Sequence, residues 1–246
     1  MEKCTCAEKR KTAAIVLAAG AGRRMNSSVQ KQFLQLGGHP VLYYSLKVFE
    51  ESEVDRIILV TGQGDIEYCR TEIVERYGFR KVAAIVAGGK ERYHSVYAGL
   101  AAVEDADEVL IHDGARPFVT QEIIHRTLEG AGNCGGCVAG MPVKDTIRLL
   151  DEQNFSKSTP DRSRLWMMQT PQTFSFPLIY DAYQKLIRQE EKGCIVSVTD
   201  DAMVLECMTG KKVKLTEGSY ENIKITTPSD LLAAEAFLAQ KVKKHY

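Results

Sequence analysis

The chain has 246 residues, of which 44% are hydrophobic and 26% are charged, a composition typical of a globular protein with a sizeable core. Its 32 basic and 32 acidic side chains give a formal net charge of zero, which argues against general binding of nucleic acid. No apolar run approaches the length of a membrane span, and residues 1–11 lack the apolar core of a signal peptide. We therefore expect a cytoplasmic protein with a flexible leader at 1–11 and a single domain at 12–246.

The first predicted element is a buried strand at 13–17, because this run is wholly apolar. Small residues follow, which let backbone N–H groups approach an anion, and they are Ala18, Ala19, Gly20, Ala21 and Gly22. Arg23 and Arg24 come next, and Lys31 lies seven residues further on. Three cations beside such a turn predict a site for the phosphates of a nucleoside triphosphate.

Two commoner phosphate-binding motifs do not fit this loop. The dinucleotide fingerprint needs a third glycine at the position of Met25. The Walker loop needs a Gly-Lys-Ser/Thr ending that no part of the chain supplies. An ordinary strand-to-helix turn with solvated arginines is the alternative, and the neighbouring cations favour phosphate.

Apolar runs then alternate with segments of helix-like spacing. Strands are expected at 55–61, 82–87, 108–112 and 137–141, and helices at 41–51, 66–77, 95–103 and 121–131. This order predicts a Rossmann-like α/β fold, with a mostly parallel twisted sheet and helices on both faces. Ligands of such sheets bind beyond the carboxyl ends of the strands. We therefore expect the loops at 20–22, 88–89 and 113–116 to meet at one rim.

The alternation breaks at 143–170, a polar segment with a turn-like centre near 151–154. We expect a projecting β-hairpin with strands at 146–150 and 164–168. A long hairpin is weakly stable alone, so its apolar side chains need either the parent domain or a second subunit. Its length favours an arm that embraces a second subunit.

The end of the chain predicts more helix than strand. We expect helices at 177–191 and 228–243, a short helix capped by residues 199–201, and strands at 212–216 and 223–226. The seven cysteines are expected to be free thiols. Cys134 and Cys137 have the spacing of a zinc or redox pair, but no second Cys or His pair completes such a site.

A few charged residues have the chemistry for nucleotidyl transfer. Arg24 and Lys31 suit stabilisation of charge on the reacting phosphorus and on leaving pyrophosphate. Asp113 ends a buried strand and suits a magnesium ion or a ligand hydroxyl, with a turn cap as the alternative. Lys224 is flanked by isoleucines, a pattern equally typical of the solvent face of an amphipathic strand.

Eight blocks, which run in order along the chain, carry a family resemblance. They lie at 17–25, 31–33, 88–96, 112–118, 142–146, 169–172, 199–202 and 218–224. Together they resemble the 2-C-methyl-D-erythritol 4-phosphate cytidylyltransferase family of the non-mevalonate isoprenoid pathway. The resemblance implies an enzyme that transfers CMP from CTP to methylerythritol phosphate and releases pyrophosphate. Residues 12–246 would then be one nucleotidyltransferase domain.

The resemblance also implies roles for individual residues. Arg24 and Lys31 would stabilise the transition state, while Arg162 and Lys224 would orient the attacking phosphate. The implied CTP contacts are Ala18, Ala19, Gly20, Gly22, Gly88, Gly89, Ser95, Asp113 and Gly114. The implied contacts to the sugar phosphate are Asp113, Arg116, Thr146, Arg162, Thr170, Glu221 and Lys224. The phosphates of CTP would hold most of the Mg²⁺ coordination, with Asp113 as a candidate ligand.

The implied assembly is a homodimer built by the 143–170 arm, in which Thr146 and Arg162 reach the neighbouring subunit's site. Three positions depart from the family pattern. Lys90 stands for an Asp and puts a side-chain contact to cytosine or ribose in question. Gln30 stands for a Pro and is expected to loosen its loop, and Glu221 stands for an Asp and needs a longer reach.

Two other functions are weighed against this one. The ribitol-5-phosphate cytidylyltransferase family shares the fold and chemistry but is less similar in the blocks at 142–146 and 199–202. A nucleotide-binding module without turnover is an alternative of a different class. The cations Arg24, Lys31, Arg162 and Lys224 are all present, which argues against a decayed active site.

Overall fold

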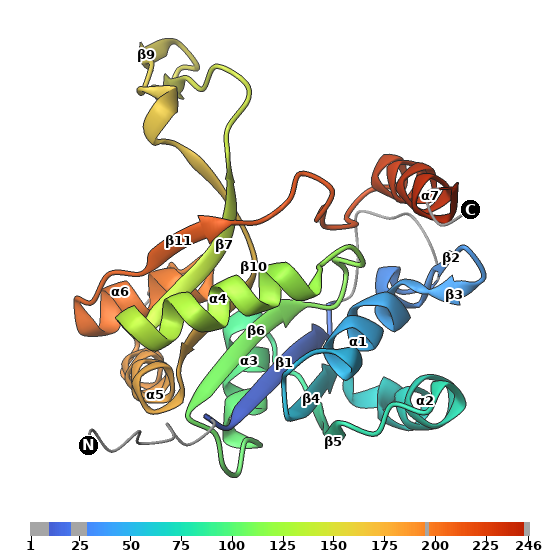
Figure 1. The fold of residues 1–246 in the computed structure, drawn as a ribbon. Coiled ribbons are helices and arrows are strands. Elements are labelled where there is room, and N and C mark those ends of the chain that lie inside the picture. Colours follow the sequence, from blue (N-terminus) through green and yellow to red (C-terminus); the bar gives the residue numbers. More distant parts are fainter. Residues whose placement is uncertain (1–9, 21–28, 195–196, 244–246) are drawn as a thin grey trace, which may run out of the picture.

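The computed structural model describes residues 10–20, 29–194 and 197–243. A seven-stranded sheet lies at its centre, in the order β11-β7-β10-β6-β1-β4-β5 (Figure 1). The strands are β1 (Thr12–Ala18), β4 (Arg56–Thr61), β5 (Val82–Ala87), β6 (Glu108–Asp113), β7 (Gly136–Pro142), β10 (Trp166–Ser175) and β11 (Lys214–Glu217). β10 runs antiparallel to β6 and β7, and the other neighbouring pairs of this sheet are parallel. The predicted α/β fold with a mostly parallel sheet is confirmed.

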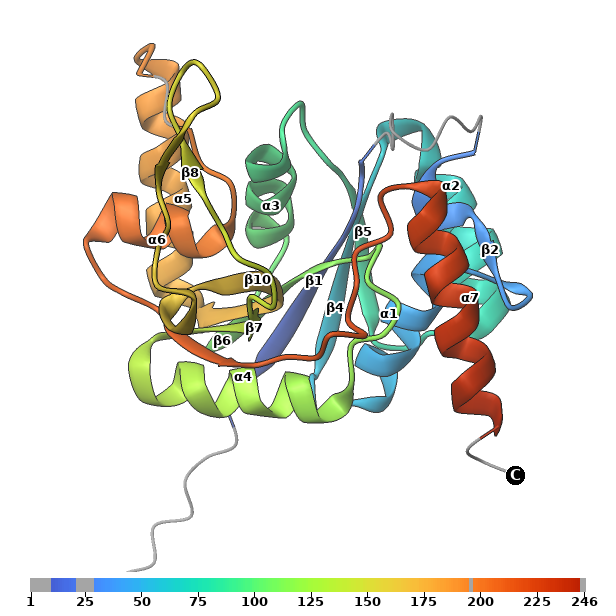
Figure 2. The same cartoon turned by 90° about the horizontal axis from the view of Figure 1, so that it is seen from above.

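Helices cover both faces of this sheet because its central strands are apolar on both sides. In β1, Ala14 and Val16 pack in one core with α1 (Val41–Glu51) and α4 (Gln121–Cys134). Ile15 packs in a second core with α3 (Arg92–Ala101), α5 (Phe176–Glu191) and α6 (Asp201–Thr209). Figure 2 shows β1 and β4 between α3 on one side and α1 on the other.

Helix α6 begins and ends at residues whose chemistry explains the boundary. α6 begins after Asp200, whose carboxylate accepts a hydrogen bond from the backbone N–H of Met203 at 2.9 Å. It ends at Gly210, which has a φ of 71°.

The predicted helix at 66–77 is divided into α2 (Ile66–Tyr68) and a π-helical segment, η4 (Cys69–Glu75).

A third, smaller core lies under the last helix, α7 (Pro228–Lys243). It contains residues of α7, of α1 and of the short strand β2 (Gln35–Leu36), which pairs with β3 (His39–Pro40). Ile225 is buried in this core, and its backbone N–H donates to Ala115 O at 2.9 Å. The strand expected at 223–226 is therefore wrong, because its isoleucines pack against helices and join no described strand ladder.

The segment at 143–165 projects from the sheet (Figure 1). It contains β8 (Leu149–Leu150), β9 (Ser156–Ser158) and a 3₁₀ turn, η5 (Arg162–Arg164). β8 pairs with β9, whereas Trp166 and Met167 belong to β10 and pair with β7. The strand predicted at 164–168 as the partner of 146–150 is therefore wrong. The reason is that residues 169–174 are buried between β6 and β7, so the strand that contains Trp166 and Met167 belongs to the central sheet.

Three further findings concern the described residues alone. None of their helices is both long and apolar enough to span a membrane. Their cysteines are free thiols, as expected, and they are Cys69, Cys134, Cys137, Cys194 and Cys207. No group of three or more potential metal ligands is found in this part of the chain.

Candidate active site

A pocket of about 310 Å³ opens beyond the carboxyl ends of β1 and β6. The loops that follow β1, β5 and β6 all reach it, so the three loops expected at one rim do meet. The residues that line it are Leu17, Ala18, Ala19, Gly20, Lys31, Gln32, Gly89, Lys90, Glu91, Arg92, Ser95, Asp113, Ala115 and Lys224. Most of the residues expected to bind CTP are among them, whereas Arg24 and Gly22 lie outside the described residues.

The loop after β5 approaches the loop after β1 closely because residue 88 is a glycine. A Cβ on Gly88 would lie 2.5 Å from Ala19 Cβ and 2.6 Å from Ser95 Oγ. The hydroxyl of Ser95 also accepts a hydrogen bond from Gly89 N at 3.1 Å. Gly88 and Ser95 thus shape the pocket wall that Gly89 and Ala19 form. Lys90, one of the three departures from the family pattern, also lines the pocket.

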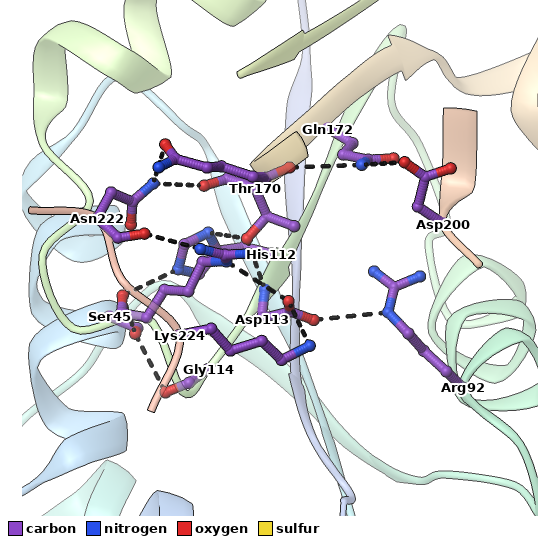
Figure 3. Close-up of polar contacts among 12 residues, drawn as sticks. Ser45, Arg92, His112, Asp113, Gly114, Thr170, Gln172, Asp200, Asn222 and Lys224 are labelled. Atoms are coloured by element: carbon purple, nitrogen blue, oxygen red, sulfur yellow. Dashed lines mark hydrogen bonds and ion pairs between the residues drawn. The ribbon is translucent and has the colours of Figure 1, made fainter. Parts of the chain in front are cut away.

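Asp113 is the electrostatic centre of the site, and three cations surround its carboxylate. Figure 3 labels two of them, Arg92 and Lys224. Lys224 Nζ lies 2.8 Å from Oδ2, Arg116 Nε lies 3.6 Å from Oδ2, and Arg92 Nε lies 3.5 Å from Oδ1. Burial would raise the pKa of Asp113, but the three positive charges outweigh it and hold this pKa well below its usual range. The side chain is therefore a carboxylate, and its negative charge balances the cations that surround it.

A directional chain of hydrogen bonds supports the backbone at Asp113. Asp113 N donates to Thr170 Oγ1 at 3.1 Å, and Thr170 Oγ1 lies 3.0 Å from His112 Nδ1. His112 Nε2 lies 3.3 Å from Arg116 O, which can only accept, so we assign the proton to Nε2. Burial lowers the pKa of His112 to about 4, and the ring is neutral at pH 7. Thr170 therefore acts on the site through β6.

The segment that carries Lys224 is fixed to β10 and to the loop after β6. Asn222 Nδ2 donates to Thr170 O at 2.9 Å, and Gln169 Nε2 donates to Ser219 O at 2.7 Å. Arg116 Nη1 donates to Asn222 O at 2.7 Å, so Arg116 binds both this segment and Asp113. Asn222 and Gln169 were not predicted as site residues, although both stand in blocks that resemble the family. Their role depends on contacts between distant segments.

Arg92 is a second group that the sequence did not reveal. Its two terminal nitrogens each lie 2.8 Å from a carboxylate oxygen of Asp201, the first residue of α6. The Asp201 side chain is completely buried and also accepts from the Tyr183 hydroxyl. Gln172 Oε1 accepts from the backbone N–H groups of Asp201 and Ala202 at 3.0 and 2.9 Å. Arg92 is thus held rigidly where it lines the pocket beside Asp113.

Other expected site residues lie outside the pocket lining. Gly114 donates from its backbone to Leu17 O at 2.8 Å, where an added Cβ would crowd Leu42. Glu221 is half-buried, and its backbone N–H donates to Ser219 Oγ at 3.1 Å. Thr146 and Arg162 are exposed on the projecting segment, where Arg162 Nη1 donates to Lys144 O at 2.8 Å. The structure of one chain therefore does not bring Thr146 and Arg162 to its own pocket.

The donor set at Asp113 fits a magnesium ion poorly. Lys224 and Arg116 both lie against Oδ2, and Arg92 lies against Oδ1, so a divalent cation would meet positive charge at either oxygen. No second carboxylate lies among the described residues that line the pocket apart from Glu91. Glu91 instead caps α3, with its side chain bound to the backbone of that helix.

Comparisons with known proteins agree with this geometry. The family described as 2-C-methyl-D-erythritol 4-phosphate cytidylyltransferase (IspD) matches residues 12–240. A protein of that name from Lachnospira eligens is 51% identical over 92% of this chain and 98% of its own. Another, from Alkaliphilus oremlandii, is 49% identical over 93% of this chain and 95% of its own.

Solved structures give the same result. The 4-diphosphocytidyl-2C-methyl-D-erythritol synthase from Anaerococcus prevotii has a TM-score of 0.81 at 33% identity, covering 94% of this chain and 96% of that one. The 2-C-methyl-D-erythritol 4-phosphate cytidylyltransferase from Thermus thermophilus has a TM-score of 0.72 at 29% identity, covering 92% and 98%. The resemblance stated from the sequence is confirmed, and this chain belongs to the 2-C-methyl-D-erythritol 4-phosphate cytidylyltransferase family.

Proposed function

We propose that this protein transfers CMP from CTP to 2-C-methyl-D-erythritol 4-phosphate, giving 4-CDP-2-C-methyl-D-erythritol and pyrophosphate. Membership of the family supports this reaction. The observation that carries it in the structure is the Asp113–Lys224 pair at 2.8 Å, which lines one pocket together with Lys31 and the glycine-rich loops. Such a pocket offers cations for both reacting phosphates and backbone N–H groups for the nucleotide.

We assign the nucleotide side of the pocket to the loops after β1 and β5. Ala18, Ala19, Gly20 and Gly22 bring backbone N–H groups to the phosphates, while Gly88, Gly89 and Ser95 contact base and ribose. Arg24 and Lys31 neutralise charge on the α-phosphorus and on leaving pyrophosphate. The described part of this set lines the pocket apart from Gly88, which sits behind it and lets the loops approach. Gly114 acts indirectly, by packing the loop after β6 against β1.

We assign the sugar phosphate to the side of the pocket where Lys224 and Asp113 lie. Lys224 orients the attacking phosphate, and Asp113 and Arg116 fix Lys224 and meet the substrate. A phosphate oxygen forms the new bond to the α-phosphorus in line, and the bond from that phosphorus to the β-phosphate oxygen breaks. The attacking phosphate monoester is already ionised near pH 7, so the step needs no general base. This agrees with His112, whose two ring nitrogens are engaged inside the protein.

Magnesium would enter this reaction bound to the nucleotide. Because the surroundings of Asp113 fit a divalent cation poorly, we assign the metal to the phosphates of CTP and no longer to Asp113. The ion supplies positive charge to the triphosphate, in addition to the positive charge of Lys31. No protein carboxylate is needed to hold it.

We further propose a homodimer built by the arm, which is taken as residues 143–165 because residues 166–170 of the expected 143–170 segment belong to β10 of the central sheet. Its apolar side chains are exposed in a single chain, including Leu149, Leu150 and Phe155. Thr146 and Arg162 on this arm would complete the neighbouring subunit's pocket from the side of the sugar phosphate, together with Thr170 and Glu221 of the chain that owns it. The single domain at 12–246 and a cytoplasmic location stay predictions.

A single assay tests the reaction against its alternatives. Pyrophosphate release is measured with CTP, Mg²⁺ and either methylerythritol phosphate or ribitol 5-phosphate. We expect release with methylerythritol phosphate that stops when any one component is omitted. Equal or faster release with ribitol 5-phosphate would reverse the choice of substrate. CTP binding without release from either acceptor would support the non-catalytic module.

A further inference from the structure

The cation Lys31 lies in a single 3₁₀ turn, η2 (Lys31–Phe33), between two glutamines. It lines the pocket, and its Cε lies 4.0 Å from the place that a Cβ on Gly20 would take. A lysine side chain is long and flexible, so the placement of its ammonium depends on how firmly its backbone is held. The contacts of Gln30 and Gln32 therefore bear on the chemistry.

A chain of amide hydrogen bonds joins η2 to the elements on either side. Gln32 Nε2 donates to Ala18 O, the last residue of β1, at 2.6 Å, and also to Gln30 Oε1. Gln30 Nε2 donates in turn to Asp65 Oδ2 at 2.7 Å. A peptide carbonyl and a carboxylate can only accept, so the orientation of both amides is fixed. The turn that carries Lys31 is thus bound between β1 and η3 (Gln63–Asp65).

The acceptor at the far end is itself built into the loop after β4. Asp65 N donates to Gly62 O at 2.9 Å, and the Asp65 carboxylate folds back over Gly62. Any side chain at position 62 would collide with Asp65 Oδ2. A second contact lies on the other side of Lys31, where the rings of Phe33 and Tyr68 meet edge to face at 5.0 Å. The turn is therefore fixed at residues 30, 32 and 33.

The backbone of Gln30 has the angle that a proline would impose. Its φ is −64° and its ψ is 141°, and a proline ring fixes φ near −65°. The family resemblance expects a proline here, and Gln30 was expected to loosen the loop. The geometry indicates the opposite. The hydrogen bond from the Gln30 side chain to Asp65 stabilises the same backbone conformation that a proline ring would fix covalently.

We propose that Gln30 and Asp65 form a positioning clamp for Lys31, which replaces a proline in this chain. The proposal rests on the proposed function, in which Lys31 neutralises the triphosphate of CTP. It makes Asp65 a positioning residue of a site that it does not line. It also predicts that Asp65 matters only while residue 30 is a glutamine.

The test compares the effect of Asp65→Ala in two backgrounds, the natural chain and Gln30→Pro. We expect Asp65→Ala and Gln30→Ala each to lower kcat by about tenfold, since small misplacements of catalytic groups are costly. Gln30→Pro should keep kcat within about twofold of the natural chain, because the ring supplies the same φ. Asp65→Ala should then cause no further loss in the Gln30→Pro background. Asp65→Asn, which keeps an acceptor oxygen, should retain most of the activity.

A general structural role for Asp65 predicts a different result. In that case Asp65→Ala would lower kcat by the same factor in both backgrounds, and the clamp would be overturned. Gln121→Ala is the matched control, because Gln121 donates to Glu51 O at 3.2 Å on an exposed surface away from the pocket. It should leave kcat unchanged. Melting temperatures of all variants identify any loss that reflects unfolding.

A binding measurement separates failure of the clamp from failure of the proposed function. Absence of CMP transfer in the natural chain would overturn the function, and the clamp is then judged from the Kd values of CTP and cytidine. The clamp predicts that Asp65→Ala weakens CTP binding and leaves cytidine binding unchanged, since Lys31 meets the triphosphate. Equal effects on both ligands, or no effect on either, would overturn it.

Discussion

Lys224 Nζ lies 2.8 Å from Asp113 Oδ2, although the two residues come from distant parts of the chain. The pair joins the end of β6 to the segment before α7, and Arg92 adds α3 to the same centre. One carboxylate thus faces three cations that come from three parts of the chain. Its removal should affect stability as well as turnover.

Replacement of Asp113 by Asn should destabilise the fold at pH 7.5. The variant keeps the shape of the side chain but removes the counter-charge of Lys224 and Arg116, whereas Arg92 still pairs with Asp201. Loss of one partner of a buried pair costs about 3 kcal/mol. Urea unfolding of the natural chain and the variant measures the difference in free energy. Asp105→Asn is the control, because Asp105 pairs with Lys11 on the surface and its loss should leave stability nearly unchanged. Equal effects of the two substitutions would contradict the central role of Asp113.

His112 should make the fold less stable as the pH falls from 7.5 to 5. Its pKa is lowered to about 4 by burial, from an ordinary value near 6.5 in the unfolded chain. The unfolded chain therefore takes up the proton first, and the stabilisation present above pH 6.5 is lost progressively as the pH falls through about 4. The expected loss between pH 7.5 and 5 is about 2 kcal/mol.

Urea unfolding at several pH values measures this loss. His112→Gln should remove about 2 kcal/mol of the pH dependence. His125→Gln, on the exposed surface of α4, should retain it because His112 is still present. An unchanged slope in His112→Gln would show that other groups cause the pH dependence.

Lys31→Ala should lower kcat by roughly a hundredfold or more, because it removes a charge that faces the transition state. Steady-state pyrophosphate release with saturating CTP measures the effect. Lys47→Ala is a control that removes a lysine of α1 paired with Glu51 on the surface. A Lys31→Ala enzyme with the kcat of the natural chain would remove Lys31 from the catalytic residues.

Mixed dimers test whether the arm completes the neighbouring site. Arg24→Ala removes a cation of the nucleotide loop, and Arg162→Ala removes one of the arm. If Arg162 acts in the partner's pocket, a mixed dimer contains one pocket with both arginines intact, and part of the activity returns. Affinity tags of two kinds isolate the mixed dimers before the assay. Inactive mixed dimers of verified composition would place both arginines in the pocket of one chain.

The strand and helix order could be predicted because the central strands are apolar on both faces. Residues 13–17 read as a buried strand, and β1 is buried along almost all of its length. The partner of β8 could not be predicted, because the segment expected to pair with it continues into β10 of the central sheet. Polar residues of that strand, such as Gln169, Thr170 and Gln172, gave no sign of burial. Their side chains are buried because they bind Ser219, His112 and the start of α6. A sequence pattern does not reveal such partners.

The residues of the site also fall into those that a sequence pattern could reveal and those that it could not. Gly88, Gly89 and Asp113 could be predicted because they follow apolar runs, and parallel strands bring their carboxyl ends to one edge. Arg92 could not, because its partner Asp201 lies on another helix far along the chain. The hydrogen bond of Gln30 could not be predicted for a similar reason, since it crosses from one loop to Asp65 in another.

The strand β10 begins at the base of the arm with Trp166 and reaches Thr170, which binds the backbone of Asp113, within the same element. An inserted or deleted residue between these two positions would shift Thr170 out of register with β6. Changes of arm length are therefore tolerable only beyond the hydrogen bond between Val143 N and Leu165 O, which closes the base of the arm. We therefore expect insertions and deletions to be harmless at the tip of the arm and to disturb the pocket when they fall at its base.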